Sequence, residues 1–183
     1  VVICPPFTYL TQILELKKLS IKVGAQNISE NKNGAYTGEI SGSILLDMNI
    51  DYVIVGHSER RRIYNETNEI IARKFELAHQ NNLIPILCVG ETLNERKTGQ
   101  TLSIIESQIK SVFELTQVEL FANSIIAYEP VWAIGTGETA SPEQAEEVHY
   151  NIRGIIEDYD PYIATSIPIL YGGSVNGENS KDL

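Results

Sequence analysis

The chain is poor in the features that mark several common protein classes. Only two of its 183 residues are cysteines, Cys4 and Cys88, and they form neither a CxxC pair nor a cluster with histidine. The sequence therefore predicts no disulfide framework and no metal site. So little cysteine fits a reducing compartment, and we expect a cytoplasmic protein.

The sequence also lacks an excess of positive charge and any long apolar segment. Fourteen Lys and Arg residues against 24 Asp and Glu residues give a net charge of −10, so we expect no nucleic-acid partner. A small anionic substrate is still compatible, because one local site can be positive on an acidic protein. No apolar run approaches the ~18 residues of a membrane span. The opening VVICPPFTYL has no charged leader or cleavage signal, so we expect no membrane partner and no secretory peptide.

What the sequence does contain is a series of short apolar runs rich in isoleucine and valine. Each is four to six residues long and shows little polar alternation, which is typical of strands buried on both faces. The runs lie at residues 1–4, 21–25, 52–55, 84–89, 125–128 and 167–171.

Helical periodicity separates these runs. Apolar residues spaced three and four apart predict helices around residues 10–14, 71–78, 102–113 and 145–156. The last of these has a clear start, because Ser141 can act as N-cap, Pro142 suits the first helical position and Gln144 can complete a capping box. Residues 176–183, NGENSKDL, predict the opening of a further helix.

This alternation predicts an α/β fold. Repeated βα units with buried parallel strands leave two architectures open, an open doubly wound sheet and a closed (β/α) barrel. No GxGxxG follows the first run, which weakens a dinucleotide-binding version of the first architecture. No linker divides the chain, so we expect one domain over residues 1–183. The polar loop at residues 27–43 is unusually long, which favours a functional or interface role.

Three groups of polar residues directly follow predicted strands, at the edge where ligands bind in both architectures. In the first group, VGHSERR, His57 precedes a segment that can begin a helix. The positive end of that helix would keep the imidazole neutral, so that it could donate one hydrogen bond to a carbonyl or enolate oxygen. The alternative is a histidine that only satisfies the turn.

The second group is a carboxylate at the mouth of a strand, Glu129. Pro130 restricts it to extended backbone angles, and the glycines downstream look like hinges of a mobile loop. A carboxylate that a lid can desolvate is a stronger base, so Glu129 is a candidate general base. The alternative is a structural carboxylate paired with a neighbouring Lys or Arg.

The third group is YGGSV at residues 171–175. Gly172 and Gly173 let backbone N–H groups approach an oxyanion and Ser174 adds a hydroxyl, so a phosphate or carboxylate could bind here. A plain tight turn is the alternative. Other polar residues near strand ends are predicted to be structural: Glu59 as a supporting carboxylate, Glu91 as a loop anchor, Lys97 as a surface charge and Cys88 as a small buried residue.

Together these motifs resemble the triosephosphate isomerase family. The matching segments are GAQN, GAYTGEIS, VGHSERR, ILCVGE, AYEPVWAIGTG and YGGSV, in the family's order and over essentially the whole chain. The resemblance implies a (β/α)8 TIM barrel. The family's barrel has eight strands and the six runs match strands two to seven. We therefore expect about six βα units, incomplete at both ends, without the lysine of the first strand or the glycine loop of the eighth.

The resemblance also implies a role for each matching position. Glu129 matches the catalytic base, His57 the electrophile that polarises the carbonyl, and Glu59 a supporting carboxylate. Lid and latch residues are matched by Pro130, Trp132, Gly137 and Tyr171. Phosphate-binding residues are matched by Gly135, Gly173 and Ser174. Thr37 matches the tip of a dimer loop at residues 27–43.

The implied reaction is the interconversion of D-glyceraldehyde 3-phosphate and dihydroxyacetone phosphate through an enediolate, a step of glycolysis and gluconeogenesis. No metal or organic cofactor is implied, and the implied partners are the triose phosphate and a second copy of the chain. Two alternatives remain open: an inactive truncated relative acting as a phosphate-binding or assembly module, and an aldolase-like barrel enzyme. The latter needs a Schiff-base lysine at a strand end, and none is visible.

Overall fold

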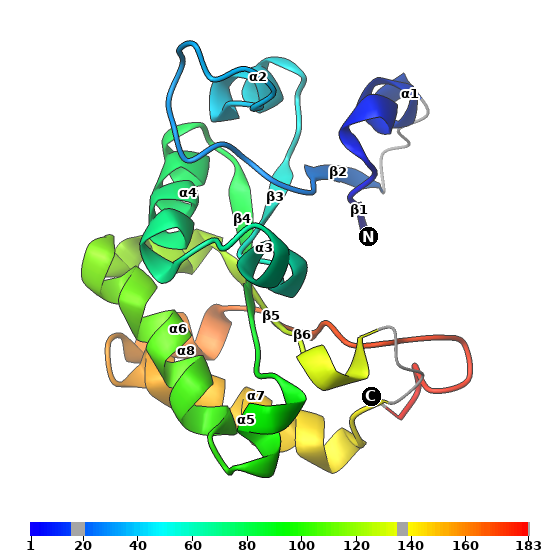
Figure 1. The fold of residues 1–183 in the computed structure, drawn as a ribbon, viewed down its shortest axis with the longest axis vertical. Coiled ribbons are helices and arrows are strands. Elements are labelled where there is room, and N and C mark those ends of the chain that lie inside the picture. The colour runs from blue at the N-terminus through cyan, green and yellow to red at the C-terminus, as the bar shows by residue number, and fades with distance from the viewer. Residues whose placement is uncertain (16–20, 135–138, 183) are drawn as a thin grey trace.

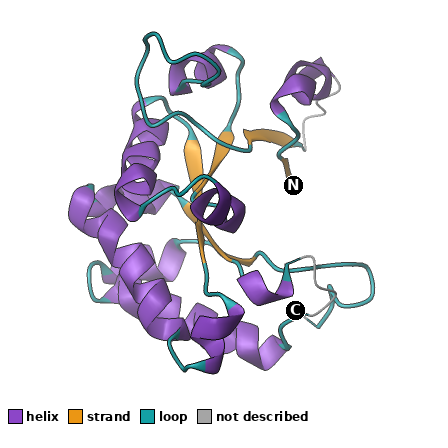
Figure 2. Ribbon diagram, viewed as in Figure 1, coloured by secondary structure: helices purple, strands orange, loops and turns teal. Residues whose placement is uncertain are grey.

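Six parallel strands form one sheet whose spatial order follows the chain (Figure 1). The computed structural model describes residues 1–15, 21–134 and 139–182. The strands are β1 (Val2–Ile3), β2 (Lys22–Ala25), β3 (Tyr52–Val55), β4 (Ile84–Val89), β5 (Ile125–Tyr128) and β6 (Ile169–Tyr171). A doubly wound sheet would reverse its order at a switch point. This sheet does not reverse and it curls (Figure 2), so it is an arc of a (β/α) barrel.

Three strands are shorter than predicted, at four ends in all. β1 lacks Val1 and Cys4, β2 begins after Ile21, and β6 begins after Pro168. The last difference has a simple cause: proline has no N–H to donate to the ladder, and here only the carbonyl of Pro168 takes part, accepting from the amide of Ile126.

Helices fill every connection between strands. They are α1 (Leu10–Glu15), α2 (Gly42–Asp47), α3 (Ser58–Ile63), α4 (Asn68–Gln80), α5 (Leu93–Lys97), α6 (Thr101–Leu115), α7 (Pro142–Glu157) and α8 (Pro161–Ser166), with the short 3-10 helices η1 (Phe7–Tyr9), η2 (Val118–Asn123) and η3 (Val131–Ala133). The four periodic helices are confirmed, as is the capping box of Ser141 and Gln144. The short helices α2, α5 and α8 lack the length to show a periodicity, and the sequence did not single them out.

The helix predicted at residues 176–183 is not formed, since residues 177–182 are turns. The side chain of Asn176 does accept from the amides of Glu178 and Asn179, as an N-cap would. The segment has no apolar stripe to bury, however, and short helices depend on such packing.

The core lies between the sheet and one layer of helices. In that layer α4 packs against α6, α6 against α7, and α7 against α8. The prediction that the strands are buried on both faces holds only in part: successive residues are buried in β2 and β5, whereas in β3 Val53 and Val55 are buried and Tyr52 and Ile54 are only half-buried. Helices cover only one face of the arc, and among the described residues no second layer covers the other.

The arc has two edge strands. Among the described residues, β1 pairs only with β2, and β6 only with β5. Ile3 in β1 and Leu170 in β6 are 38% and 46% exposed, which is high for strand residues of this kind.

The long polar loop after β2 is closed at its base. The amide of Ser29 donates to the carbonyl of Ile40 at 2.9 Å. Ser41 then caps α2, whose first two residues are Gly42 and Ser43. The loop therefore ends at residue 41 and not at 43, because the Ser41 hydroxyl accepts from the Ile44 amide and starts the helix.

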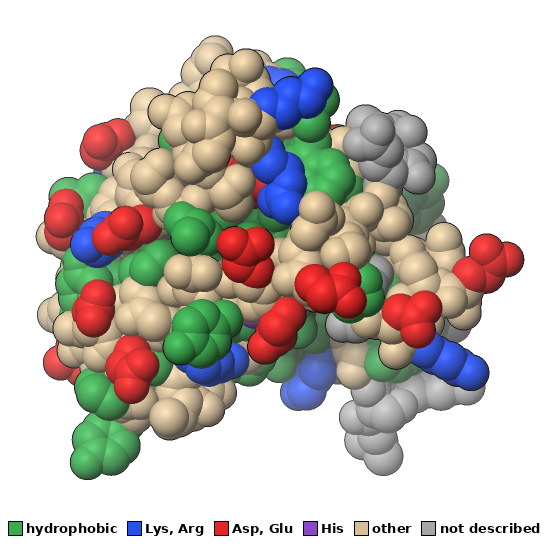
Figure 3. Space-filling view, turned by 90° about the horizontal axis from the view of Figure 1, so that it is seen from below, with side chains coloured by type: hydrophobic (Ala, Val, Ile, Leu, Met, Phe, Trp, Pro, Cys, Tyr) green, Lys and Arg blue, Asp and Glu red, His purple; other side chains and the backbone are tan. Residues whose placement is uncertain are grey.

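The surface is mixed in charge on the face shown in Figure 3, where acidic side chains are scattered and basic ones lie between them. Across the described part of the chain, no helix is both long and apolar enough to cross a membrane.

Candidate active site

The three predicted groups gather at one edge of the sheet. His57 follows β3, Glu129 follows β5 and the YGGSV loop begins in the last residue of β6. Because all strands are parallel, their carboxyl ends share this edge, which is where barrel enzymes place their active sites.

His57 is the N-cap of α3, and this position defines its protonation pattern. The Nδ1 atom accepts a hydrogen bond from the amide of Glu59 at 3.2 Å. Nδ1 therefore carries a lone pair, and the ring proton of the neutral form is on Nε2. Nε2 lies 3.0 Å from Oε1 of Glu129, so the protonated edge of the neutral imidazole faces this carboxylate. The expected placement of the ring at the positive end of a helix is confirmed.

Glu129 is almost completely buried, with 5% of its surface exposed. Its Oε2 accepts from the amide of Ser58 at 2.9 Å, and its Oε1 lies 3.0 Å from Nε2 of His57. Burial raises the pKa of Glu129, while His57 and the Ser58 amide act in the opposite direction. Burial therefore enhances the basicity of the carboxylate, while the Ser58 amide and His57 fix its direction.

Two glycines allow the surrounding backbone to approach Glu129 closely. A Cβ on Gly90, at the end of β4, would lie 1.7 Å from the carbonyl oxygen of Glu129. A Cβ on Gly172 would lie 3.0 Å from its Cγ. The absence of a side chain at Gly90 allows β4 to approach the backbone carbonyl of Glu129, and at Gly172 it leaves room for the Glu129 side chain.

Glu91 anchors the segment that follows Glu129. This fully buried carboxylate accepts at Oε1 from Trp132 Nε1 at 2.9 Å, Arg96 Nη1 at 3.1 Å and the Tyr128 hydroxyl at 3.2 Å. The guanidinium of Arg96 also stacks on the Trp132 ring, 4.8 Å from its centroid. These contacts agree with the structural role predicted for Glu91 and fix the start of the predicted lid.

The YGGSV loop contacts both ends of the predicted lid. The hydroxyl of Ser174 donates to the carbonyl of Ala133 at 3.0 Å, and the hydroxyl of Tyr171 accepts from the amide of Ala140 at 3.1 Å. At the start of the predicted lid, Pro130 directly precedes η3 and Trp132 lies within it. Gly135 and Gly137, predicted to belong to the lid, lie outside the described residues.

The remaining predicted residues lie further from the acid–base pair. Glu59 meets His57 through its backbone amide, while its exposed carboxylate is 3.9 Å from Nδ1. Lys97 is exposed at the end of α5, as expected of a surface charge. Thr37 is exposed in the loop after β2, and none of its described contacts is with His57 or Glu129.

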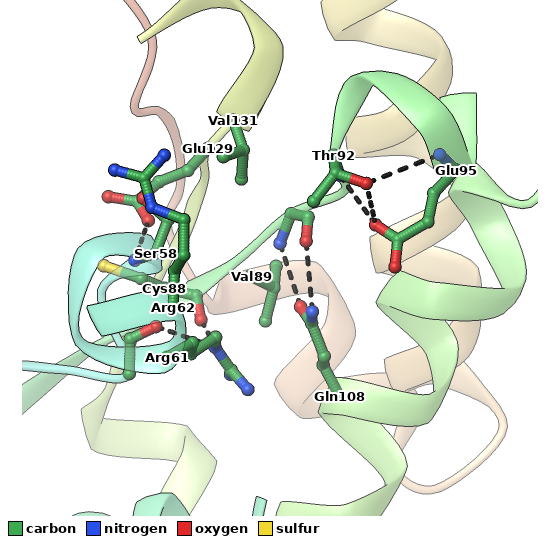
Figure 4. A pocket seen from close by; sticks show the side chains of 12 residues that line it. Ser58, Arg61, Arg62, Cys88, Val89, Thr92, Glu95, Gln108, Glu129 and Val131 are labelled. Carbon is green, nitrogen blue, oxygen red and sulfur yellow. Dashed lines mark hydrogen bonds between the residues drawn. The ribbon is translucent and has the colours of Figure 1, made fainter. Parts of the chain in front are cut away.

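A cavity of about 310 Å³ is lined by Glu129 and lies between α3 and the start of α5 (Figure 4). Its floor is apolar, with Val89 and Val131, and Arg61 and Arg62 of α3 line one side. Both cysteines are free, and Cys88 also lines this cavity. Burial raises the pKa of its thiol, which keeps it protonated and unreactive.

Sequence reasoning missed several residues that shape the site. The Ser58 amide, Arg61 and Gly90 were not singled out, although they lie in motifs that were quoted, and Arg96 lies outside those motifs. Backbone amides and glycine contacts depend on tertiary distances. The signal that was available was position, since each lies within seven residues of a strand end.

The fold and this site define a (β/α) barrel protein whose strand ends carry a carboxylate and a histidine arranged for acid–base chemistry. The model of the family described as triosephosphate isomerase matches residues 1–183. The chain therefore belongs to the triosephosphate isomerase family.

Individual relatives agree with this assignment. The triosephosphate isomerase of Alcanivorax borkumensis is 52% identical over 180 residues, covering 98% of this chain and 73% of the relative. That of Methylococcus capsulatus is 50% identical over 182 residues, covering 99% and 73%. That of Xanthomonas campestris pv. campestris is 50% identical over 184 residues, covering 100% and 73%.

Proposed function

We propose that this chain interconverts D-glyceraldehyde 3-phosphate and dihydroxyacetone phosphate by proton transfer through an enediolate. The observation that carries the proposal is the 3.0 Å contact between Nε2 of His57 and Oε1 of Glu129 at the carboxyl edge of the sheet. Family membership supports the same reaction.

The mechanism follows from the hydrogen bonds of the pair. Glu129 is held by His57 and by the Ser58 amide, so a bound substrate must draw its carboxylate away from these donors. The substrate's carbonyl oxygen then replaces the carboxylate as acceptor of the Nε2 proton. Glu129 removes a proton from the adjacent carbon, and His57 stabilises the enediolate oxygen. Glu129 returns this proton to the neighbouring carbon, while His57 donates its Nε2 proton to the first oxygen and takes up the hydroxyl proton of the second, which completes the isomerisation.

The phosphate end of the substrate is assigned to Gly173, Ser174 and Gly135. Ser174 now donates to Ala133, so phosphate binding would exchange that acceptor for a phosphate oxygen. Trp132 and the Tyr171 latch would then hold the lid, residues 130–137, over the substrate. The reaction is a proton transfer that side chains can carry, so the proposal names no cofactor.

A coupled assay of the chain in both directions tests this function. Turnover of both triose phosphates, with isotope exchange from solvent into the product carbon, is the expected result. Tight binding of a phosphorylated enediolate mimic by calorimetry without any turnover would instead support the phosphate-binding alternative. Absence of both turnover and binding would overturn the proposal.

We also propose a cytoplasmic homodimer. Both cysteines are free, which fits a reducing compartment, and cell fractionation would test the location. The loop at residues 27–41 and the neighbouring helices present exposed apolar side chains for an interface: Tyr36, Ile44, Ile63 and Tyr64, between 45% and 63% exposed. Thr37 lies on the same loop and would reach the second copy.

The interface predicts a specific mutational result. Tyr36→Glu places a charge in the loop and should convert a dimer to a monomer in sedimentation velocity, because an unpaired charge in a buried interface is costly. Tyr162→Glu is the matched control, since Tyr162 is 87% exposed on α8 and lies outside the proposed interface. A monomeric parent chain, or a dimer that persists in Tyr36→Glu, would contradict this interface.

A further inference from the structure

Arg61 of α3 connects three elements around the acid–base pair. Its Nε donates to the carbonyl of Gly56 at 2.8 Å, its Nη1 to Oδ1 of Asn68 at 2.8 Å, and its Nη2 to the carbonyl of Cys88 at 3.2 Å. These acceptors belong to the turn before His57, to the start of α4 and to the end of β4. One guanidinium thus ties together the segments that flank both members of the pair.

The contact with Gly56 bears directly on His57. Gly56 is the residue before His57 and has a φ of 74°, a left-handed conformation that favours glycine. A Cβ at this position would lie 3.1 Å from Nη2 of Arg61. The guanidinium therefore packs against the backbone from which the imidazole extends, and its hydrogen bond to the Gly56 carbonyl holds that turn.

The contact with Cys88 bears on Glu129. Cys88 pairs with Ala127 in the ladder between β4 and β5, two residues before Glu129. Its carbonyl is the acceptor for Arg61, as Figure 4 shows. The same side chain therefore constrains the strand ends that carry the imidazole and the carboxylate.

The chemistry of Arg61 is unusual for a partly buried cation. All three of its acceptors are uncharged oxygens, and within the described parts of the chain it forms no ion pair with a carboxylate. Burial lowers the pKa of Arg61, although arginine stays charged at any physiological pH. The burial of this cation is better explained by the geometry of its hydrogen bonds than by neutralisation of a carboxylate, because only a planar guanidinium can donate in three fixed directions at once.

We propose that Arg61 is a positioning residue that sets the distance and direction between His57 and Glu129. Its three described hydrogen bonds all go to protein oxygens, so its removal should lower kcat more than it raises KM. This inference rests on the proposed isomerase function for its kinetic readout, but its structural readout does not depend on turnover.

The kinetic test compares three variants. Arg61→Met should lower kcat by about 10- to 100-fold, as expected when reacting groups are misplaced by about 1 Å, with KM changed by no more than about threefold. Arg61→Lys should be nearly as impaired, since a single ammonium cannot reach three acceptors. Lys97→Met is the control: it removes a positive charge from an exposed residue at the end of α5, outside the cavity, and should change kcat by less than about threefold.

Chemical rescue separates positioning from general damage. The cavity beside Arg61 is about 310 Å³ and open to solvent, so guanidinium ions can reach the space left by Arg61→Ala. Guanidinium chloride far below denaturing concentrations should restore part of kcat, whereas methylammonium chloride at equal ionic strength should not. Asn68→Ala, which removes only one acceptor, should cause a smaller loss and serves if the Arg61 variants unfold.

The structural test is the NMR signal of the His57 Nε2 proton. The parent chain and Lys97→Met should show a protected imidazole N–H that faces Glu129, and Arg61→Met and Asn68→Ala should show it broadened or shifted. An unchanged signal and unchanged kcat in Arg61→Met would overturn the positioning role. If the parent chain shows no turnover, the proposed function fails, and the imidazole signal alone then decides the role of Arg61.

Discussion

Glu129→Gln is expected to lower kcat about 10³-fold while leaving the fold intact. The amide cannot accept a proton from carbon, and general-base catalysis by a positioned side chain typically contributes 10²- to 10⁴-fold. The substitution is nearly isosteric, and one amide oxygen can still accept from Ser58 or His57. Steady-state kinetics in both directions measure the effect.

Stability provides a second readout for the same variant, with a defined sign. Burial raises the pKa of Glu129, so in a range above pH 4.5 the native state holds a proton that the unfolded chain has lost. Stability from this group is therefore complete at low pH and is lost as pH rises through the raised pKa. At pH 7 to 8 the glutamine variant should melt at the same temperature as the parent chain or above it, so its lost activity cannot be attributed to unfolding.

The pH profile of the parent chain follows from the same shift. The base must be ionised to act, so kcat/KM should fall on the acid side with an inflection above pH 4.5, the ordinary value for glutamate. Glu147→Gln, an exposed substitution on α7, is the control and should leave both rate and profile unchanged. A Glu129→Gln variant with parental turnover would remove Glu129 from the role of base.

Much of the fold could be predicted from local pattern. The six apolar runs became the six strands, and the capped helix at Ser141 begins where expected, because strand burial and capping depend on neighbours in sequence. Burial was predicted less well. The exposure of Ile54 and Leu170 depends on what covers the inner face of the arc, and a strand's own residues do not carry that information.

The candidate site, too, could be predicted from the sequence only in part. His57, Glu129 and Ser174 follow strand ends, so their common edge could be inferred from parallel topology alone. The tautomer of His57 could not, because it depends on one backbone amide at 3.2 Å. Nor could the roles of Arg61 and Gly90, since hydrogen bonds to carbonyls and contacts with backbone atoms leave no pattern in residue type.

Gly90→Ala is expected to have the second large effect, through backbone displacement. The new Cβ would lie 1.7 Å from the carbonyl oxygen of Glu129 and 2.7 Å from its carbonyl carbon, whereas real Cβ contacts are essentially never under 3.0 Å. The position of a Cβ is set by the backbone, so no rotamer relieves the contact. The strand ends must separate by more than 1 Å, which strains the 2.7 Å hydrogen bond from the Glu129 amide to Val89.

Both activity and stability should respond to this displacement. Moving the base by about 1 Å should lower kcat by about 10²-fold, and overpacking should cost about 1–3 kcal/mol of unfolding free energy. The paired amide and carbonyl of Gly90, both bonded to Gln108 of α6, resist any compensating shift of β4. Kinetics and thermal melts on one preparation measure both losses.

Alanine substitutions at two other glycines provide a comparison for Gly90→Ala. Gly154→Ala, inside α7 with open space around the new methyl, should raise the unfolding free energy by roughly 0.5–1 kcal/mol and leave kcat unchanged. Gly172→Ala, whose Cβ would lie 3.0 Å from Glu129 Cγ and 3.1 Å from the Tyr128 carbonyl oxygen, should fall between the two, because these contacts require a much smaller shift than the one at Gly90. If Gly90→Ala matched the parent chain in both kcat and melting temperature, the close approach of β4 to Glu129 would not constrain the base, and the order of the three variants would lose its physical explanation.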